Sequence, residues 1–388
     1  MSQTQPVQRV GLTLGLLFAS AFLAGVGFGI YMPFIPIQAL NMGAPPWIAT
    51  ALVFAFPYIM ALIVEIPVGI YADRSGRRVE IILIGLVISA IATALMAFAT
   101  NWIELTIYRT ITGLAFAFGA LYLAVTGLVT PPERRGLWLG LMAGTMLLGM
   151  GVSEIPSGII LSMIGYKGMY LLATAFLIIS LLLLIPVKAP RVKIPTISTA
   201  DFGKVFRVKG VYWVAISIMV YLLGWQILYP SFSVVLSEVF KAPAALTGAI
   251  FSVATILLGV GSYIWGPVVD RLGGRMTLFM AIVISAILTF IILAGLTNMW
   301  FYSVLFWLVT LFGVVGMPGT TYVAQRSVSP EYYSIATTII WLFIVIPGII
   351  SGFLAGAILT SLGLRLTVIV TGIIELIGGL MMLGLPKV

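Results

Sequence analysis

The sequence GIYADRSGRR, residues 69–78, recurs in altered form three more times along this chain. A second copy that keeps the Asp-Arg pair is GPVVDRLGGR at 266–275, and weaker copies are GIILSMIGYK at 158–167 and GAILTSLGLR at 356–365. The two stronger copies start 197 residues apart, and each is followed by a weaker copy after 89 or 90 residues. Four copies at two regular spacings indicate an internal repeat.

The composition shows what medium surrounds this repeat. Of the 388 residues, 61% are hydrophobic and only 8% are charged. A soluble chain carries about a quarter charged residues, because it must cover its core with polar surface. Roughly twenty consecutive apolar residues cross a bilayer as a helix, and such stretches recur all along the chain. We therefore expect an all-α polytopic membrane protein.

Twelve apolar stretches are long enough to span a membrane. The first is too long for the core of a signal peptide and lacks a small-residue cleavage site, so we expect it to be retained. The four repeat copies end the second, fifth, eighth and eleventh stretches. Copies three helices apart have opposite orientations, so each half is predicted to be an inverted pair of three-helix units. The expected spans are 11–37, 47–71, 79–99, 102–127, 137–161, 168–187, 210–236, 244–268, 276–296, 299–323, 333–358 and 365–385.

One long polar stretch, 188–209, divides the chain into two predicted six-helix bundles, 1–187 and 210–388. Sixteen of the 20 Lys and Arg residues lie in the termini and in the loops on one predicted side, and the opposite loops hold three. Because basic loops stay in the cytoplasm, we expect both termini to be cytoplasmic, in the plasma membrane. The basic residues follow topology and form no single patch, so no nucleic-acid partner is expected.

With these features the chain resembles the major facilitator superfamily, whose signature G-x-x-x-D-R-x-G-R-R between spans two and three is complete here. The family also has an Arg in the fourth span followed by Gly four residues later, which Arg109 and Gly113 match. The resemblance implies two six-helix bundles around a central cavity that opens alternately to either side. The Gly-Pro-x-x-Gly-Gly pattern of the family's drug–proton antiporters has only a loose version in span five, at Gly144, Gly149, Gly151, Pro156 and Gly158.

The two stronger repeat copies supply candidates for a gate at the cytoplasmic face. Gly69 would let helices approach closely. Asp73 needs a partner, such as Arg77 or the positively polarised start of a helix from the other half. The alternative is that the arginines only anchor a loop to anionic lipid. The gate candidates are Gly69, Asp73, Arg74, Gly76, Arg77, Arg78, Asp270 and Arg271.

Ionisable residues within the predicted spans are costly in lipid and mark further candidate sites. Arg109 and Glu154 lie at depths of about 10 and 12 Å from the same end, so they are predicted to approach one another, facing the central cavity. Such a pair would either carry protons or only neutralise two buried charges. Glu65 shares a helical row with the gate residues and is expected between the halves, as a proton site or a gate residue. For Glu375, in the last span, we expect only a local partner.

Aromatic and amide side chains of spans one and seven are candidates for solute contacts. The resemblance places spans one, four, seven and ten around the cavity. An aromatic, weakly polar lining favours an amphipathic organic solute over a sugar. The alternative is that these residues anchor the protein at the membrane interface. The candidates are Tyr31, Phe34, Gln38, Trp225, Gln226 and Tyr229.

The predicted function is secondary active transport, with proton-coupled export of a small amphipathic solute preferred over import or uniport of a nutrient. The alternative from another class is a membrane-embedded lipid-modifying enzyme. The sequence has no Cys, no His and no polar catalytic cluster for such an enzyme, and no G-x-x-x-x-G-K-[ST] sequence for ATP. We expect no catalytic residue, cofactor or metal, and a monomer whose partners are the solute, protons and the lipid bilayer.

The gate hypothesis predicts the effect of Asp73→Asn. If the carboxylate latches the cytoplasmic face, its removal changes both the transport rate and the balance between inward-facing and outward-facing conformations. Transport into proteoliposomes and accessibility of cysteines introduced on either face would measure the two effects. An unchanged rate together with an unchanged balance would show that Asp73 has no role in a gate.

Overall fold

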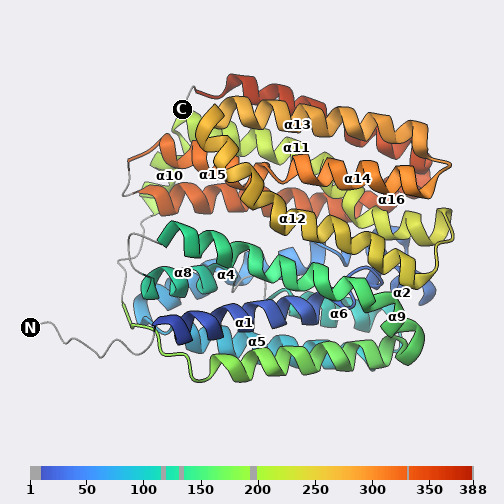
Figure 1. The fold of residues 1–388 in the computed structure, drawn as a ribbon, viewed down its shortest axis with the longest axis horizontal. Coiled ribbons are helices and arrows are strands. Elements are labelled where there is room, and N and C mark those ends of the chain that lie inside the picture. The colour runs from blue at the N-terminus through green and yellow to red at the C-terminus, as the bar shows by residue number, and fades with distance from the viewer. Residues whose placement is uncertain (1–9, 115–118, 131–134, 193–198, 330–331, 387–388) are drawn as a thin grey trace, which may run out of the picture.

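The computed structural model describes residues 10–114, 119–130, 135–192, 199–329 and 332–386. Within these ranges the regular structure is entirely helical, and most helices run along the long axis of the molecule (Figure 1). A helix satisfies nearly all of its backbone hydrogen bonds within its own segment, as the interior of a lipid bilayer demands. The expectation of an all-α membrane protein is confirmed.

The N-terminal half contains eight helices in the described residues. Its first two predicted spans are each broken: α1 and α2 are separated by turns that contain Pro33, and α3 and α4 by turns at 52–54. Pro57 lies in the first turn of α4 and has no N–H with which to extend that helix backwards. The helices are α1 (Val10–Gly29), α2 (Ile35–Asn41), α3 (Pro46–Ala51), α4 (Ala55–Ser75), α5 (Arg78–Met96), α6 (Trp102–Thr112), α8 (Gly119–Val129) and α9 (Arg135–Leu184).

The remaining helices follow residue 198. One of them, α10, lies inside the polar stretch 188–209, where the sequence predicted only a linker, and its Phe206 ring stacks on Phe343 at 5.5 Å. The others form the C-terminal half. The bounds are α10 (Thr199–Phe206), α11 (Lys209–Val234), η2 (Val235–Val239), α12 (Ala244–Leu272), α13 (Gly274–Ile291), η3 (Ile292–Gly295), α14 (Met299–Gly313), α15 (Gly316–Arg326), α16 (Tyr333–Met381) and η5 (Met382–Gly384).

The four repeat copies share one structural role, which is to end a helix at a glycine. The eighth residue of each copy has a positive φ: 71° at Gly76, 65° at Gly165, 78° at Gly273 and 73° at Gly363. L side chains rarely adopt this conformation, so glycine is the residue that fits it. At Gly165 and Gly363 the chain turns back within α9 and α16, each of which therefore contains two spans (Figure 1).

These turns explain the span count. Among the described residues, nine helical segments have the length and apolarity to cross a membrane. Two of the nine, in α9 and α16, are hairpins of two spans each. The helices α6 and α8 flank residues 115–118 where the fourth span was predicted. The arrangement is consistent with the twelve predicted spans.

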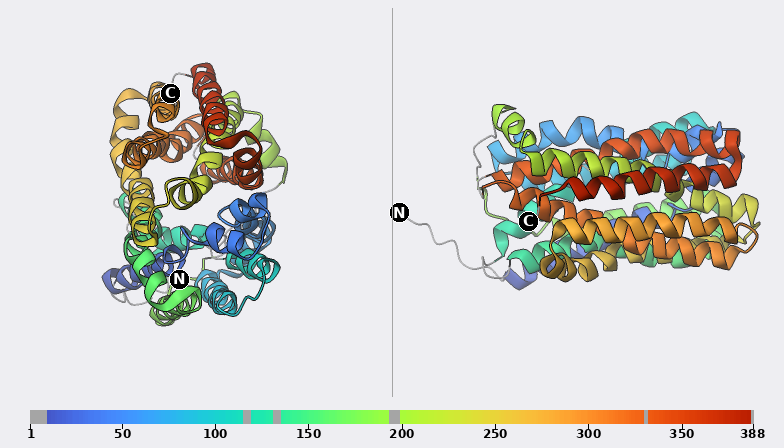
Figure 2. Two further views of the ribbon diagram at one scale, coloured as in Figure 1. Left: turned by 90° about the vertical axis from the view of Figure 1, so that its right-hand side faces the viewer. Right: turned by 90° about the horizontal axis from the view of Figure 1, so that it is seen from above.

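The two halves lie side by side as separate bundles (Figures 1 and 2). The helices coloured blue to green form one bundle and those coloured yellow to red form the other. The start of α1, the end of η5 and α10 lie at one end of the molecule, which we call the terminal end, and α2 lies at the opposite end (Figure 1). The two bundles, related by the sequence repeat, are the pseudo-symmetric architecture that the sequence predicted.

The turn glycines make a stability prediction. Gly363→Ala forces a Cβ into a conformation with φ 73° and ψ 170°, which costs roughly 1–3 kcal/mol. We expect a lower apparent melting temperature of the purified protein in detergent. Gly15→Ala is the matched control, because Gly15 lies inside α1 with no atom within 4 Å of an added Cβ, and it should leave the melting temperature unchanged or slightly raised. Equal melting temperatures for Gly363→Ala and the wild type would contradict the assigned turn.

Candidate functional site between the two halves

At the opposite end, α3 of the N-terminal half packs against α16 of the C-terminal half. We call this contact the first seam between the halves. The Thr50 hydroxyl donates to the Gly352 carbonyl at 2.9 Å and accepts from the Gly356 N–H at 2.9 Å. A Cβ on Gly352 would lie 2.8 Å from the Ala55 Cβ, and one on Gly356 would overlap the Pro46 carbonyl. Glycine at both positions therefore allows the backbones to meet.

A second seam joins α9 to α12. A Cβ on Gly158 would overlap the Ala244 backbone, and one on Gly248 would lie 2.8 Å from the Glu154 carbonyl oxygen. Further along, the Tyr263 hydroxyl donates to the Leu141 carbonyl at 3.0 Å. The loosely matched glycine pattern of span five thus includes a residue that brings the two halves together.

The repeat glycines near the terminal end lie outside these seams. No atom lies within 4 Å of where a Cβ on Gly69 or on Gly266 would be. Gly69 therefore makes no close helix contact in this conformation, and its role in a gate stays a prediction. Glu65 does lie between the halves, as expected, and its Oε2 accepts a hydrogen bond from Trp341 Nε1 at 3.1 Å. Whether it acts in a gate or in proton transfer stays a prediction.

The loop of the first repeat copy holds the start of the polar stretch 188–209. Arg78 is buried, and its Nη1 donates to the Val192 carbonyl at 2.8 Å. Arg191 forms an ion pair with Glu80 at 2.6 Å, and its backbone lies about 3.0 Å from where a Cβ on Gly76 would be. A buried Arg78 does not reach lipid headgroups, so the lipid-anchor alternative fails for this residue.

The remaining gate candidates are either exposed or have a side chain that lies outside the described residues. Arg74, Arg77, Asp270 and Arg271 are exposed. The Asp73 side chain lies outside the described residues, although its backbone lies in the last turn of α4. The proposed latch at Asp73 therefore stays a prediction.

Arg109 is fully buried in α6 and directs its guanidinium at the break between α3 and α4. Its Nε donates to the Leu52 carbonyl at 2.9 Å and its Nη2 to the Val53 carbonyl at 3.2 Å. The Val53 carbonyl is free for this bond because Pro57, four residues later, has no N–H to donate. The guanidinium also contacts Thr112 Oγ1 at 3.1 Å, Tyr31 Oη at 3.4 Å and Met32 Sδ at 3.4 Å.

Glu154 lies in the seam between α9 and α12. Its carboxylate is fully buried, and neither oxygen has a hydrogen-bond partner. The neighbouring Thr255 hydroxyl is hydrogen-bonded to Tyr229 Oη at 2.9 Å. Arg109 and Glu154 are both fully described and form no ion pair here, so the predicted approach is absent from this conformation. The number of residues from the helix end predicted the depth of each side chain but not the direction in which it points from the helix axis.

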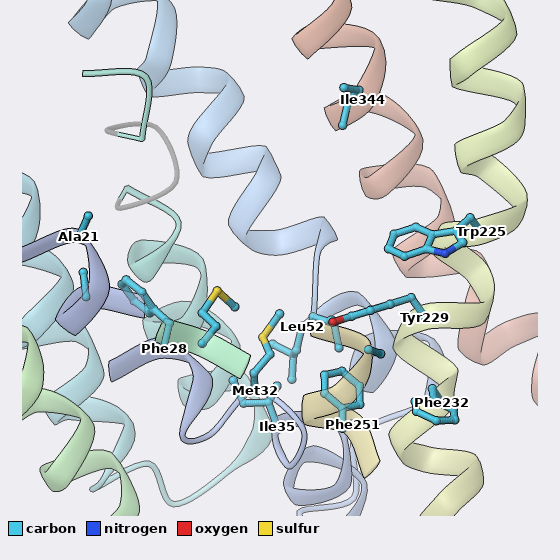
Figure 3. Close-up of a cluster of buried hydrophobic side chains, with 14 of the residues drawn as sticks. Ala21, Phe28, Met32, Ile35, Leu52, Trp225, Tyr229, Phe232, Phe251 and Ile344 are labelled. Atoms are coloured by element: carbon cyan, nitrogen blue, oxygen red, sulfur yellow. The ribbon is translucent and has the colours of Figure 1, made fainter. Parts of the chain in front are cut away.

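An aromatic cluster lies between the halves, centred on Tyr229 (Figure 3). The Tyr229 ring lies 4.9 Å from Trp225, 5.2 Å from Phe251 and 5.9 Å from Phe306, all in the C-terminal half. Across the interface it lies 5.4 Å from Phe54. Figure 3 shows Tyr229 extending from α11 toward the side on which Leu52 and Met32 lie. The cluster thus reaches from both halves to the backbone that Arg109 contacts.

Two buried polar atoms beside this cluster lack partners. Trp225 Nε1 and Gln226 Oε1 have no hydrogen bond, whereas Gln226 Nε2 donates to the Ile344 carbonyl at 3.4 Å. Trp225 and Tyr229 are only 7% and 4% exposed, so they do not anchor the protein at the membrane surface. One free donor and one free acceptor therefore remain among apolar rings.

The candidates from span one lie elsewhere, inside the N-terminal half. Tyr31 is fully buried with its ring 5.2 Å from Tyr170, and Gln38 accepts a hydrogen bond from Tyr170 Oη. Phe34 is buried in the same core. These three support Arg109 and α2 in this conformation, and the structure does not bring them together with Trp225, Gln226 and Tyr229.

Several site residues were missed by sequence reasoning. Thr50, Trp341 and Thr255 are single polar or aromatic residues in apolar spans, and no spacing in the sequence distinguishes them. Pro57 carried a usable signal, since a proline in a span predicts unpaired carbonyls in the preceding turn. In the described ranges, no group of three or more acidic side chains is placed to hold a metal ion.

Two inverted-repeat helical bundles with polar groups buried between them are the architecture of a class of membrane transporters. The chain belongs to the Major Facilitator Superfamily, whose profile matches residues 17–219 and 214–388. This is a family of transporters and not of enzymes.

Relatives and solved structures agree with this assignment. The multidrug resistance protein MdtG of Proteus mirabilis is 26% identical over 172 residues, 43% of this chain, and the match spans only 42% of that relative's length. MdtG of Citrobacter koseri is 24% identical over 289 residues, 71% of this chain and 70% of that protein. The crystal structure of a bacterial homolog to human lysosomal transporter Spinster has a TM-score of 0.80 at 14% identity, over 98% of this chain and 97% of that one. At this identity the likeness shows the fold.

The contacts of Arg109 predict that Arg109→Lys lowers the stability of the folded protein. A lysine keeps the charge but has no fork with which to reach two successive carbonyls and a hydroxyl. Each hydrogen bond lost from a charged group costs about 1.5–3 kcal/mol, so the apparent melting temperature should fall by several degrees. Arg207→Lys, at an exposed position in the polar stretch, is the control and should match the wild type. If the two variants melt alike, Arg109 does not brace the break between α3 and α4.

Proposed function

We propose that this chain is a proton-coupled exporter of small amphipathic organic solutes. The observation that carries the proton coupling is the position of Glu154, buried without a hydrogen bond in the seam between the halves. The direction of transport draws support from relatives that are named multidrug resistance proteins. Import or uniport by the same fold is the second candidate.

The energetics of Glu154 link its proton to the closing of the seam. An unpaired carboxylate buried in a low-dielectric interior costs several kcal/mol, so the closed seam favours the neutral acid. Opening of the opposite end separates α9 from α12 near Gly158 and admits water, in which the carboxylate is stable. The opposite end therefore closes after Glu154 has bound a proton, which makes proton uptake from that side part of the cycle.

Binding of the solute would be coupled to binding of this proton through Tyr229. Its hydroxyl is hydrogen-bonded at 2.9 Å to Thr255, whose hydroxyl neighbours the Glu154 carboxylate. A solute that hydrogen-bonds to Tyr229 frees Thr255 to donate to the Glu154 carboxylate, which favours release of the proton. Solute binding and proton binding thus oppose one another, as exchange of the two requires.

The proposed solute class follows from the aromatic cluster. Its rings carry no charge, and its free polar atoms are the Trp225 N–H donor and the Gln226 carbonyl acceptor. Apolar walls with a few placed polar groups suit an amphipathic organic molecule. A sugar would leave many of its hydroxyls without partners in this surrounding.

The proposed arrangement in the cell places the terminal end in the cytoplasm of a plasma-membrane protein. Residues 1–187 and 210–388 act as two bodies joined by 188–209, and the chain works as a monomer. The present conformation then faces the cytoplasm: α3 and α16 are in contact at the opposite end, and no atom lies within 4 Å of a Cβ on Gly69 or Gly266, although α9 and α12 stay in contact as far as Leu141 and Tyr263. The Spinster homolog of the same fold is described as inward-facing and unoccupied, which supports this reading.

Glu154→Gln tests the proposal. The amide cannot ionise, so accumulation driven by a pH gradient should be lost while solute exchange across proteoliposomes continues. Glu238→Gln is the matched control, because that carboxylate is half exposed and pairs with Lys241 at 3.5 Å outside the seams; it should behave as the wild type. Accumulation that survives in Glu154→Gln would assign Glu154 a structural role and move the proton to another group, with Glu65 the next to test.

A further inference from the structure

We propose that Glu375 is a second proton-binding site, enclosed within the C-terminal half and separate from the seam that holds Glu154. Glu375 lies in the second span of α16 and is fully buried. The site does not depend on the proposed export function, whereas its use in transport does. Its chemistry is the binding and release of one proton by one carboxylate.

Hydroxyl groups of α13 surround one side of this carboxylate. Its Oε2 accepts a hydrogen bond from Thr289 Oγ1 at 2.9 Å and lies 3.5 Å from Ser285 Oγ. Its Oε1 is buried and has no hydrogen-bond partner. One oxygen is thus held in place while the other is left as the position for a proton.

The repeat shows that packing alone does not require a carboxylate here. A Cβ on Gly224 would lie 2.9 Å from Glu375 Cγ, and one on Gly27, 197 residues earlier, would lie 3.0 Å from Leu177 Cγ. Glu375 and Leu177 each follow a turn glycine by twelve residues. The same contact is therefore made by leucine in one half and by glutamate in the other.

The pair of hydroxyl residues beside Glu375 is present in both halves, so the two halves differ at this place in the carboxylate. Ser285 and Thr289 correspond to Ser89 and Thr93, in the related sequences SAILT and SAIAT. In the N-terminal half Thr93 donates to the Ser89 carbonyl at 2.8 Å, and the Ser89 hydroxyl is buried without a partner. The C-terminal half thus has an ionisable group beside the hydroxyl pair, and the N-terminal half has the pair without it.

The surroundings favour a proton over a metal cation. From α13, the hydroxyls of Ser285 and Thr289 face Glu375. From α11, the titratable side chain that faces Glu375 in the described part of the chain is Tyr221. No basic side chain among the described residues pairs with it, so an ionised Glu375 would be an uncompensated charge. A metal ion would need several oxygen ligands, whereas within the described ranges Oε1 has no hydrogen-bond partner and Oε2 has only the two hydroxyls of α13.

The same hydroxyls connect Glu375 with the interface between the halves. Ser285 Oγ lies 3.4 Å from Tyr221 Oη. Tyr221 Oη in turn occupies the space above Gly313, the last residue of α14 before its break with α15, and Trp225 Cδ1 lies 3.6 Å from the same point. A change in the charge of Glu375 therefore acts on the break between α14 and α15 and on the aromatic cluster.

Infrared spectroscopy of the purified protein tests this site directly, without any solute. We expect a carbonyl band of a buried, protonated carboxylic acid near neutral pH that is absent from Glu375→Gln and from Glu375→Leu. The leucine variant copies the N-terminal half and should fold, and Glu154→Gln should retain the band. Thr289→Ala should shift the band frequency because Oε2 loses its donor, whereas the matched Thr93→Ala should not.

Exchange of this proton gives the deciding outcomes. The band should shift when the protein is transferred to D2O and should be replaced by a carboxylate band as the pH is raised. A band that neither exchanges nor titrates, or no Glu375-dependent band at any pH, would overturn the proposal. Loss of the band on addition of NaCl at constant pH would also overturn it, in favour of a sodium site. Since no transport is measured, a failure of the export proposal leaves this result intact.

Discussion

Backbone hydrogen bonds in lipid must be made within the protein, because the hydrocarbon interior offers no water to replace them. The spans of this chain depart from continuous helix at a few places, and two of these lie beside the site. At 52–54 the freed carbonyls bind the Arg109 guanidinium. At the break between α14 and α15, the Tyr221 hydroxyl occupies the space that Gly313 leaves open. The protein thus concentrates its unpaired backbone where side chains of other helices can meet it.

This constraint also explains why Arg109 does not need a carboxylate. A buried guanidinium has five donors, and in this structure carbonyls, hydroxyls, a thioether and the face of Tyr31 at 5.7 Å occupy its surroundings. The arginine binds the carbonyls of the break that precedes Pro57, and the break accommodates the arginine. Glu154 is left without a counter-charge in the seam between the halves, which is the reason we propose it as a proton site.

Much of the fold was predictable from the sequence because it depends on local chemistry. Apolar length predicted the spans, and the fourfold repeat predicted the inverted units whose turns at Gly76, Gly165, Gly273 and Gly363 all have positive φ. The site was less predictable, because a rise of 1.5 Å per residue gives depth but no rotation about the helix axis. Arg109 and Glu154 have similar depths but face different neighbours. The lack of contact at Gly69 depends on the conformation, which sequence alone does not specify.

The contacts at the two ends of the polar stretch limit how far the halves can separate. Arg78 and Glu80 fix residues 191 and 192 to the N-terminal half, and Phe206 fixes α10 to α16 through Phe343. Only 193–198 remain between these attachments, and a chain of that length extends to roughly 25 Å at most. The stretch is therefore a short covalent connection whose length sets an upper bound on the distance between its two attachments.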